Sequence, residues 1–411
     1  MVALAAGSRA PFPRLWLSGF LADFGDGVRL AAFPLLAVQF TRSPLAVAAV
    51  TAVQGLPWLV TGAGLGVLVD RTDRRRLMVI VNIVQALVIG ALAVAILAHS
   101  AGLLLIYLTA LVTGLGAALR GTAATASVPQ LVEPADLDQA NGRVVAGQIV
   151  GNELAGPAAG GWLFGLAAVL PFALNAGALG IAALLLLTLP SVFRPGPRDS
   201  AQIPASRLAA LRRDTAEGVS WLWHHAEIRD LTVTVGVISA MDAAWFAVLV
   251  LYVTQVLHQR SGSYGLLLAS AALGGIATGA FGTRLTRRLG PWSSLVIAGL
   301  AMAGSQAGLG VNANVIIAAV LLLISSAAFA LFNMTAVTMR QRLVPAGLLG
   351  RVSSLYSTVA LGAEALGAIA GGTLAAAAGI RAPMLVGAVP IAALTAALAW
   401  RHCRSAPGAN S

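Results

Sequence analysis

Lysine is absent from this chain of 411 residues, so all 26 of its basic residues are arginine. A nucleotide-binding P-loop ends in Gly-Lys-Ser or Gly-Lys-Thr, and a chain without lysine cannot contain one. Cysteine occurs once, at Cys403, which excludes an internal disulfide and a paired-thiol metal site. The zinc-protease pattern H-E-x-x-H and the hydrolase pattern G-x-S-x-G do not occur. We therefore expect no enzyme, no ATP-driven pump, no metal and no cofactor.

Charge is also scarce, because only 10% of the residues are charged while 58% are hydrophobic, with a mean hydropathy of +0.86. Soluble domains carry about one charged residue in four. A helix needs ~20 mainly apolar residues in a row to cross a bilayer. Twelve such runs occur, at 14–39, 44–69, 77–98, 102–124, 141–165, 169–190, 230–257, 263–283, 291–311, 313–339, 352–378 and 381–400. They predict an all-α integral membrane protein, since barrel strands would alternate over about ten residues.

The arginines lie almost entirely on one side of the predicted membrane. With both termini in the cytoplasm, all but four arginines lie in cytoplasmic segments or at cytoplasmic helix ends. Arg42, Arg260 and Arg381 lie outside, and Arg29 lies within a span. This positive-inside bias sets the orientation of a multi-pass protein of the cell membrane. The formal net charge of +11 therefore reflects topology, and no nucleic-acid partner is expected.

Segment 191–229 divides the twelve runs into two sets of six. It begins with proline and arginine, in SVFRPGPRDSAQIP, and continues as a predicted surface helix. We therefore expect an N-terminal six-helix bundle (1–190), a cytoplasmic linker with a surface helix (191–229), and a C-terminal six-helix bundle with a short cytoplasmic tail (230–411).

The two halves look like copies of one unit. The segment ELAGPAAGG at 153–161 matches EALGAIAGG at 364–372, and Asp26 occupies the place that Asp242 has in the second half. Internal repeats are typical of secondary transporters, whose substrate site lies between the repeats near mid-membrane.

Residues 66–76, GVLVDRTDRRR, resemble the loop motif G-x-L-x-D-R-x-x-R-R of the major facilitator superfamily, with Asp73 in place of the usual glycine. The segments GDG at 25–27, PQLVEPADLDQANG at 129–142 and RQRLVPAGLLGRV at 340–352 are similar to its drug and metabolite exporters, a branch that includes macrolide efflux proteins and a siderophore exporter. The resemblance covers essentially the whole chain. It implies the major facilitator fold, twelve transmembrane helices in two pseudo-symmetric bundles, with helices three, six, nine and twelve facing lipid.

The loop motif has two interpretations. By resemblance, Asp70 contacts the start of helix eleven and closes the cytoplasmic side in one conformation only, so the contact acts as a conformational gate. Alternatively, the charges only set topology. The gate candidates are Gly66, Asp70, Arg71, Arg74, Arg75, Gly350 and Arg351.

Four acids lie deep in the predicted spans: Asp26, Glu153, Asp242 and Glu364. Each lies about twelve residues from a cytoplasmic helix end, which is ~18 Å at 1.5 Å per residue and close to the midplane. Charges there are costly and usually functional. These acids are the candidates for proton coupling.

Other polar groups of the inner spans are candidates for the substrate cavity. Asp23, Asp26 and Arg29 lie on one side of the first helix, where an internal ion pair would make Arg29 tolerable in the bilayer. Arg120 either meets an acid or an anionic substrate group, or extends to lipid phosphates. Trp58 and Trp245 either stack on a substrate or serve as interface anchors or packing. The full set of cavity candidates is Asp23, Arg29, Gln54, Trp58, Arg120, Gln148, Asn152, Trp245 and Asn333.

Glu153 precedes GPAAGG, which resembles the G-P-x-x-G-G core of a fifth-helix motif associated with antiporters. Small residues allow helices to approach closely. Because Glu153 shares a face with Gly156 and Gly160, it either faces the opposing half as a gate hydrogen bond or takes part in proton coupling, and Glu364 has the same alternatives. The helix-packing candidates are Gly156, Pro157, Gly160, Gly161, Gly367, Gly371 and Gly372.

These observations predict a proton antiporter that exports hydrophobic or amphipathic small molecules by alternating access and acts as a monomer. The predicted cavity walls are rich in alanine, glycine, leucine and valine, which suits an apolar ligand better than a sugar. A siderophore carrier, a lysolipid carrier and a non-transporting membrane sensor on the same fold are the alternatives.

Overall fold

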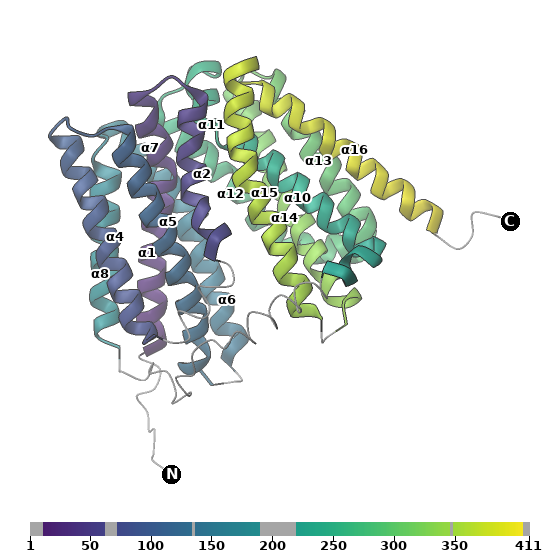
Figure 1. Cartoon of the computed structure of the whole chain (residues 1–411), viewed down its shortest axis with the longest axis horizontal. Helices are drawn as coiled ribbons and strands as arrows, with labels where there is room; N and C mark the ends of the chain where they lie inside the picture. Colours follow the sequence, from purple (N-terminus) through teal and green to yellow (C-terminus); the bar gives the residue numbers. More distant parts are fainter. Residues whose placement is uncertain (1–10, 62–71, 134–135, 190–218, 346–347, 406–411) are drawn as a thin grey trace, which may run out of the picture. The chain divides into compact units, whose positions relative to one another are not determined.

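The computed structural model describes residues 11–61, 72–133, 136–189, 219–345 and 348–405, and helices account for most of them (Figure 1). The elements of the first half are α1 (Pro11–Phe40), α2 (Pro44–Thr61), α4 (Arg74–Leu97), α5 (Leu103–Ser127), the short 3-10 helix η1 (Val128–Gln130), α6 (Leu137–Gln148), the π-helix η3 (Ile149–Ala155), α7 (Gly156–Leu166) and α8 (Leu170–Leu187). Here α6, η3 and α7 together form the predicted fifth span.

The second half repeats this series of long helices. Its elements are α10 (Ala226–Phe246), α11 (Leu249–Leu251), the π-helix η4 (Tyr252–Val256), α12 (Ser261–Leu289), α13 (Pro291–Val311), α14 (Val315–Leu343), α15 (Leu349–Ala378) and α16 (Ala382–Ser405). The seventh predicted span corresponds to α10, α11 and η4. Each of the twelve predicted runs thus contains described helix, although residues 62–69 of the second run lie outside the described residues, as does most of the predicted linker, residues 190–218.

The described residues form two compact units. The first contains residues within 1–42, 53–198 and 258–269, and the second contains residues within 43–52, 199–257 and 270–411. We refer to them as the first and second units. The bundle boundaries at 190 and 230 stay predictions.

In the first unit, α1 packs against α5, α6, η3, α7 and α8, while α4 packs against α5 and α8. Glycines permit the close approach of α1 to the fifth span. A Cβ on Gly27 would lie 2.6 Å from the carbonyl oxygen of Asn152, and a Cβ on Gly156 would lie 2.7 Å from the Cα of Gly27. Gly160 faces the backbone of Val28 in the same way. This packing places the charged stretch of α1 inside the first unit.

In the second unit, α10 has the equivalent central position and packs against α14, α15 and α16. A Cβ on Gly367 would collide with the backbone of Ala240, and one on Gly371 with the backbone of Ala244. The glycines of EALGAIAGG therefore seat α15 on α10, just as those of ELAGPAAGG seat α7 on α1. Gly372 faces Ala48 of α2.

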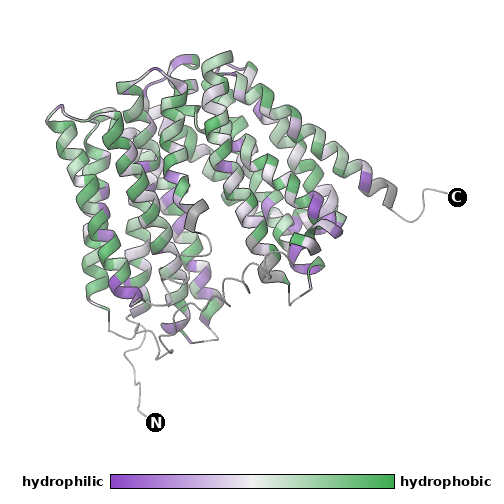
Figure 2. Cartoon of the chain, in the orientation of Figure 1, coloured by the Kyte–Doolittle hydropathy of each residue, from purple (hydrophilic) through white to green (hydrophobic). Residues whose placement is uncertain are grey.

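Apolar side chains cover the outside of the helices, and hydrophobic residues predominate along their length (Figure 2). Among the described helices, nine are long and apolar enough to cross a membrane. Large exposed side chains on α4, α8, α13 and α16 include Leu87, Leu184, Leu300 and Val389. These four helices are the third, sixth, ninth and twelfth spans, and their exposed apolar faces suit contact with lipid.

Candidate functional site

Asp26 lies between two arginines in the interior of the first unit. Its Oδ1 accepts a hydrogen bond from Arg29 Nη2 at 3.1 Å, and its Oδ2 accepts one from Arg120 Nη2 of α5. The three side chains are almost completely buried, with 4%, 1% and 6% of their residue surfaces exposed for Asp26, Arg29 and Arg120. Burying such charges is costly unless each is paired and hydrogen-bonded. Removing any one of the three side chains would therefore leave another buried charge uncompensated.

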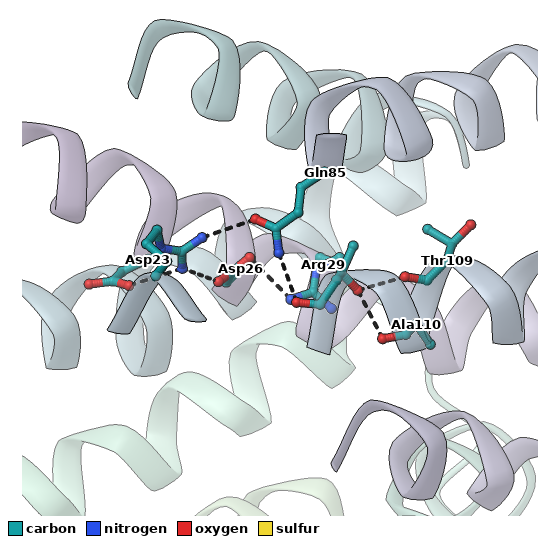
Figure 3. A network of polar contacts seen from close by, with 8 residues as sticks. Asp23, Asp26, Arg29, Gln85, Thr109 and Ala110 are labelled. Atoms are coloured by element: carbon teal, nitrogen blue, oxygen red, sulfur yellow. Dashed lines mark hydrogen bonds and ion pairs between the residues drawn. The ribbon is translucent and has the colours of Figure 1, made fainter. Parts of the chain in front are cut away.

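Further polar contacts extend this triad into a network (Figure 3). Asp23 Oδ1 lies 3.5 Å from Arg120 Nη2, and Arg120 Nη1 donates to Gln85 Oε1 of α4 at 3.2 Å. Gln85 Nε2 donates in turn to the carbonyl of Thr113 at 2.8 Å. Gln54 of α2, with its amide oxygen toward Arg29, accepts from Nη1 and Nη2 at 2.5 and 3.3 Å. Two acids and two arginines balance, so the network carries no net charge when all four are ionised.

The network decides two alternatives left open by the sequence. Arg29 forms the internal ion pair with Asp26 that its spacing predicts, and its guanidinium also lies 5.3 Å from the ring centre of Phe33. Arg120 does not extend to lipid phosphates, so that interpretation was wrong, because its guanidinium is buried against Asp26 and Asp23.

The predicted acids of the second unit, Asp242 and Glu364, differ from Asp26 in their polar partners. Asp242 of α10 accepts a hydrogen bond from the indole nitrogen of Trp245 at 3.1 Å, and Glu364 lies on α15, which packs against α10. Within the described residues neither carboxylate forms an ion pair. Trp245 is 4% exposed and is therefore not an interface anchor. Matching positions in the two halves, Asp26 and Asp242, thus have opposite electrostatic settings.

A cavity of about 280 Å³ opens between α10, α14 and α15 of the second unit. Its wall is mostly apolar, with Phe329 and Phe332 among its side chains, and it includes the predicted site residues Asn333 and Glu364. Arg340 also lines it, stacked with its guanidinium carbon 4.0 Å from the ring centre of Tyr356. Sequence reasoning treated Arg340 only as a topology signal, since nothing in a helix-end arginine shows that its side chain turns inward.

The remaining candidates do not join a common site. Glu153 and Gln148 are exposed on the fifth span, and the backbone of Asn152 is covered by Gly27. The two alternatives for Glu153 stay predictions, and Gly156 and Gly160 pack against α1 of their own unit. Pro157 is buried beside them, and a Cβ on Gly265 would lie 3.0 Å from the Cα of Gly161. Nothing is described for the side chain of Trp58.

The loop motif has a structural role that its sequence did not reveal. Arg74 Nη1 donates to the carbonyl of Ala126 near the end of α5 at 2.7 Å. Arg75 Nε donates to the carbonyl of Leu186 near the end of α8 at 2.9 Å. Helix ends leave carbonyls without partners, so arginines placed there are doubly favoured by hydrogen bonds and by the helix dipole.

Asp73, where the family motif has glycine, caps α4 by accepting from the backbone N–H of Arg76 at 3.1 Å. The other gate candidates give no test of the predicted latch. Gly66, Asp70 and Arg71 lie outside the described residues, and Gly350 and Arg351 belong to the first turn of α15, with no side-chain contacts described.

Comparison with known proteins agrees with this architecture. The chain is 26% identical over 398 residues to the multidrug efflux pump Tap of Mycolicibacterium fortuitum, covering 93% of each chain. It is 26% identical over 385 residues to the enterobactin exporter EntS of Citrobacter koseri, covering 89% of this chain and 85% of the exporter.

Solved structures show the same fold. A bacterial homologue of the iron transporter ferroportin matches with a TM-score of 0.73 at 18% identity, covering 94% of this chain and 98% of that one. A bacterial homologue of the lysosomal transporter Spinster matches with a TM-score of 0.72 at 16% identity, covering 97% of this chain and 98% of that one. The family model of the Major Facilitator Superfamily matches residues 15–363 and 232–411. With twelve predicted spans, an all-helical described structure and this match, the chain belongs to the major facilitator superfamily of multi-pass membrane transporters.

Proposed function

We propose that this chain is a secondary transporter that exports hydrophobic or amphipathic small molecules in exchange for protons, by alternating access. The observation that carries the proposal is the contrast between the acids of the two units. In the first unit Asp26 is neutralised by Arg29 and Arg120, whereas in the second unit Asp242 and Glu364, on the packed helices α10 and α15, form no ion pair with the described residues.

Asp26 is poorly suited to carry the transported proton. A proton on its carboxylate would weaken the charge-assisted bonds to both arginines and leave the buried Arg29 without an anionic partner among the described residues, which is strongly unfavourable. Its network therefore has a structural task, which is to hold α1, α2, α4 and α5 together. The proton-coupling role is therefore assigned to the acids of the second unit.

Asp242 and Glu364 are better suited, because neither forms an ion pair with the described residues, so a proton on either one breaks no bond to a cation there. Glu364 also lines the open cavity, so a ligand in the cavity and a proton on Glu364 would influence each other directly. Exchange of one for the other is what antiport requires.

The cargo is proposed from the cavity and from the relatives. An apolar wall with a few polar groups suits loosely specified amphipathic molecules. The relationship to a multidrug efflux pump supports a drug or natural product as cargo, and that to an enterobactin exporter supports a siderophore as the second candidate. We further propose that the protein acts as a monomer in the cell membrane, with both termini cytoplasmic and with the Asp70 latch closing the cytoplasmic side.

Inside-out membrane vesicles from cells that express the chain test both parts of this proposal. The vesicles are energised by respiration and loaded with a dye that reports their internal acidity. Erythromycin, tetracycline or ethidium is then added. Export into the vesicle in exchange for protons will reduce the internal acidity. Asp242→Asn and Glu364→Gln should abolish this response.

Glu227→Gln is the matched control, since Glu227 is an exposed acid in the first turn of the same helix as Asp242. It should respond like the wild type. An unchanged proton response in both Asp242→Asn and Glu364→Gln would disprove the coupling assignment. Equal drug tolerance in cells with and without the protein, over a broad panel of compounds, would disprove export.

A further inference from the structure

Arg340 is a buried cation without a counter-ion among the residues that the structure describes. Only 8% of its surface is exposed, its Nε and Nη1 atoms make no hydrogen bond, and it forms no ion pair with the described residues. A guanidinium buried in an apolar interior loses several kcal/mol of hydration free energy, and without an ion pair or a hydrogen bond this loss is not compensated. Native structures rarely leave such a group without a partner, which can be an ordered water, an ion or a ligand.

A second unsatisfied donor lies beside it. The hydroxyl of Tyr356, a residue only 5% exposed, has no hydrogen-bond partner, and its ring supports the guanidinium at 4.0 Å. Stacking on an aromatic face holds an arginine in place without using its N–H groups. Ser239, Ser357 and Asn333 add polar groups to the same wall. Polar groups of α10, α14 and α15 therefore line the cavity together with Arg340.

Glu364 lines the same cavity and yet forms no ion pair with Arg340. Tyr356 and Glu364 are eight residues apart on α15, which is ~12 Å along a helix axis. The cavity thus has a cationic end and an acidic region, with apolar side chains between them. A molecule with an anionic head and an apolar body fits this order of groups.

We propose that this cavity is a binding subsite for an anionic group, a carboxylate or phosphate, of an amphipathic ligand, with Arg340 as the binding group and Tyr356 as its positioning residue. Arginine binds both anions through two parallel N–H···O bonds, which matches the free Nε and Nη1. This inference deepens the proposed function, because it names the chemical class of one cargo: an amphipathic anion.

The test is a binding experiment on purified protein in a neutral detergent. The probes are 11-(dansylamino)undecanoic acid and its methyl ester, which differ only in the anionic group. The wild type should bind the acid more tightly than the ester. Arg340→Gln should weaken binding of the acid by about 10- to 100-fold and leave the ester unchanged, since a hydrogen bond to a charged group contributes about 1.5–3 kcal/mol.

Arg342→Gln is the matched control, because it removes the same charge from an exposed position two residues further along α14. It should bind the acid like the wild type. Arg340→Lys keeps the charge but not the planar fork, and it should show intermediate affinity. Tyr356→Phe should retain most of the acid's affinity, because the ring supports the guanidinium.

The comparison of acid and ester in the wild type does not depend on the folding of any variant. Equal affinities for the two probes, or an acid affinity unchanged in Arg340→Gln, would overturn the proposal. Competition with dihexanoyl-phosphatidylglycerol separates two sources of the anion. Displacement of the acid identifies a lipid head group, and no displacement identifies a free amphiphile; both require the Arg340 site.

Failure here is distinguishable from failure of the proposed function. Binding of the acid through Arg340 with no proton exchange in vesicles would retain the subsite and disprove antiport. Proton-coupled export of ethidium without any preference for the acid would retain antiport and disprove the subsite.

Discussion

At the scale of single residues, position in a helix did not reveal electrostatic partners. The spacing of Asp26 and Arg29 correctly predicted their ion pair within α1, because residues three apart share a face of a helix. The bond from Arg120 to Asp26 joins residues 94 positions apart, and no local pattern encodes it. Arg340 was missed for the same reason, since its inward orientation depends on Tyr356 of another helix.

We expect Arg120→Gln to destabilise the protein strongly. It leaves Asp26 with one of its two cations and Asp23 with none of its described bonds, and breaking a buried pair costs about 3–5 kcal/mol. Thermal unfolding in detergent measures the effect. Arg143→Gln, at an exposed position, should leave the midpoint unchanged. A midpoint for Arg120→Gln equal to that of the control would show that the network is not needed for stability.

The difference between Asp26, which is paired, and Asp242, which forms no ion pair with the described residues, also predicts which transport activity Asp242→Asn loses. If Asp242 serves coupling and not substrate binding, reconstituted Asp242→Asn should lose concentrative transport of ethidium driven by a pH gradient. Exchange of labelled for unlabelled ethidium needs no net proton movement, so it should continue near the wild-type rate. Measuring both in one preparation separates coupling from folding. Loss of exchange together with concentrative transport would contradict the assignment.

At the scale of helices, glycines determine which pairs of helices touch. The repeat of ELAGPAAGG and EALGAIAGG was visible in the sequence, but the partner of each glycine stripe was not. The structure shows α7 on α1 and α15 on α10, with backbone against backbone. Sequence periodicity gives the face of a helix and leaves open which neighbour lies on it.

Gly371→Ala should therefore destabilise the protein although alanine is the better helix former. Its new methyl group would collide with the backbone of Ala244, and overpacking of this kind typically costs about 1–3 kcal/mol. Gly279→Ala is the matched control, since a Cβ there meets nothing within 4 Å, and it should be neutral or gain up to about 1 kcal/mol. The unfolding midpoint of Gly371→Ala should fall, whereas that of Gly279→Ala should stay the same or rise; an equal fall in both variants would refute this explanation.

At the scale of the whole molecule, composition predicted most of what was found. The twelve apolar runs, the helical class and the superfamily follow from hydropathy and from the loop motif. The sequence did not predict how the described residues group, since residues 43–52 of the first half belong to the second unit and 258–269 to the first. Such grouping depends on long-range contacts, which hydropathy does not report.

The single cysteine offers a direct test of orientation. Cys403 is predicted to be cytoplasmic, so a membrane-impermeant maleimide should not label it in intact cells, whereas a permeant maleimide should. Ser100→Cys in a Cys403→Ser background places a thiol in the exposed turn after α4, and the impermeant reagent should label it. The reverse labelling pattern would invert the predicted topology.

The π-helix η3 has a consequence for the length of the fifth span. Its last turn closes with a bond from the N–H of Gly156 to the carbonyl of Gly151, five residues back, so this turn holds one residue more than an α-turn. One residue rotates a helix by about 100°, so the helical wheel of α6 does not continue into α7. Deleting one residue within 149–155 would let this turn close as an ordinary α-turn and would leave the residues of α6 and α7 on the faces they have now. Relatives one residue shorter in this stretch should therefore keep the helix contacts on both sides of it and differ only in the turn itself.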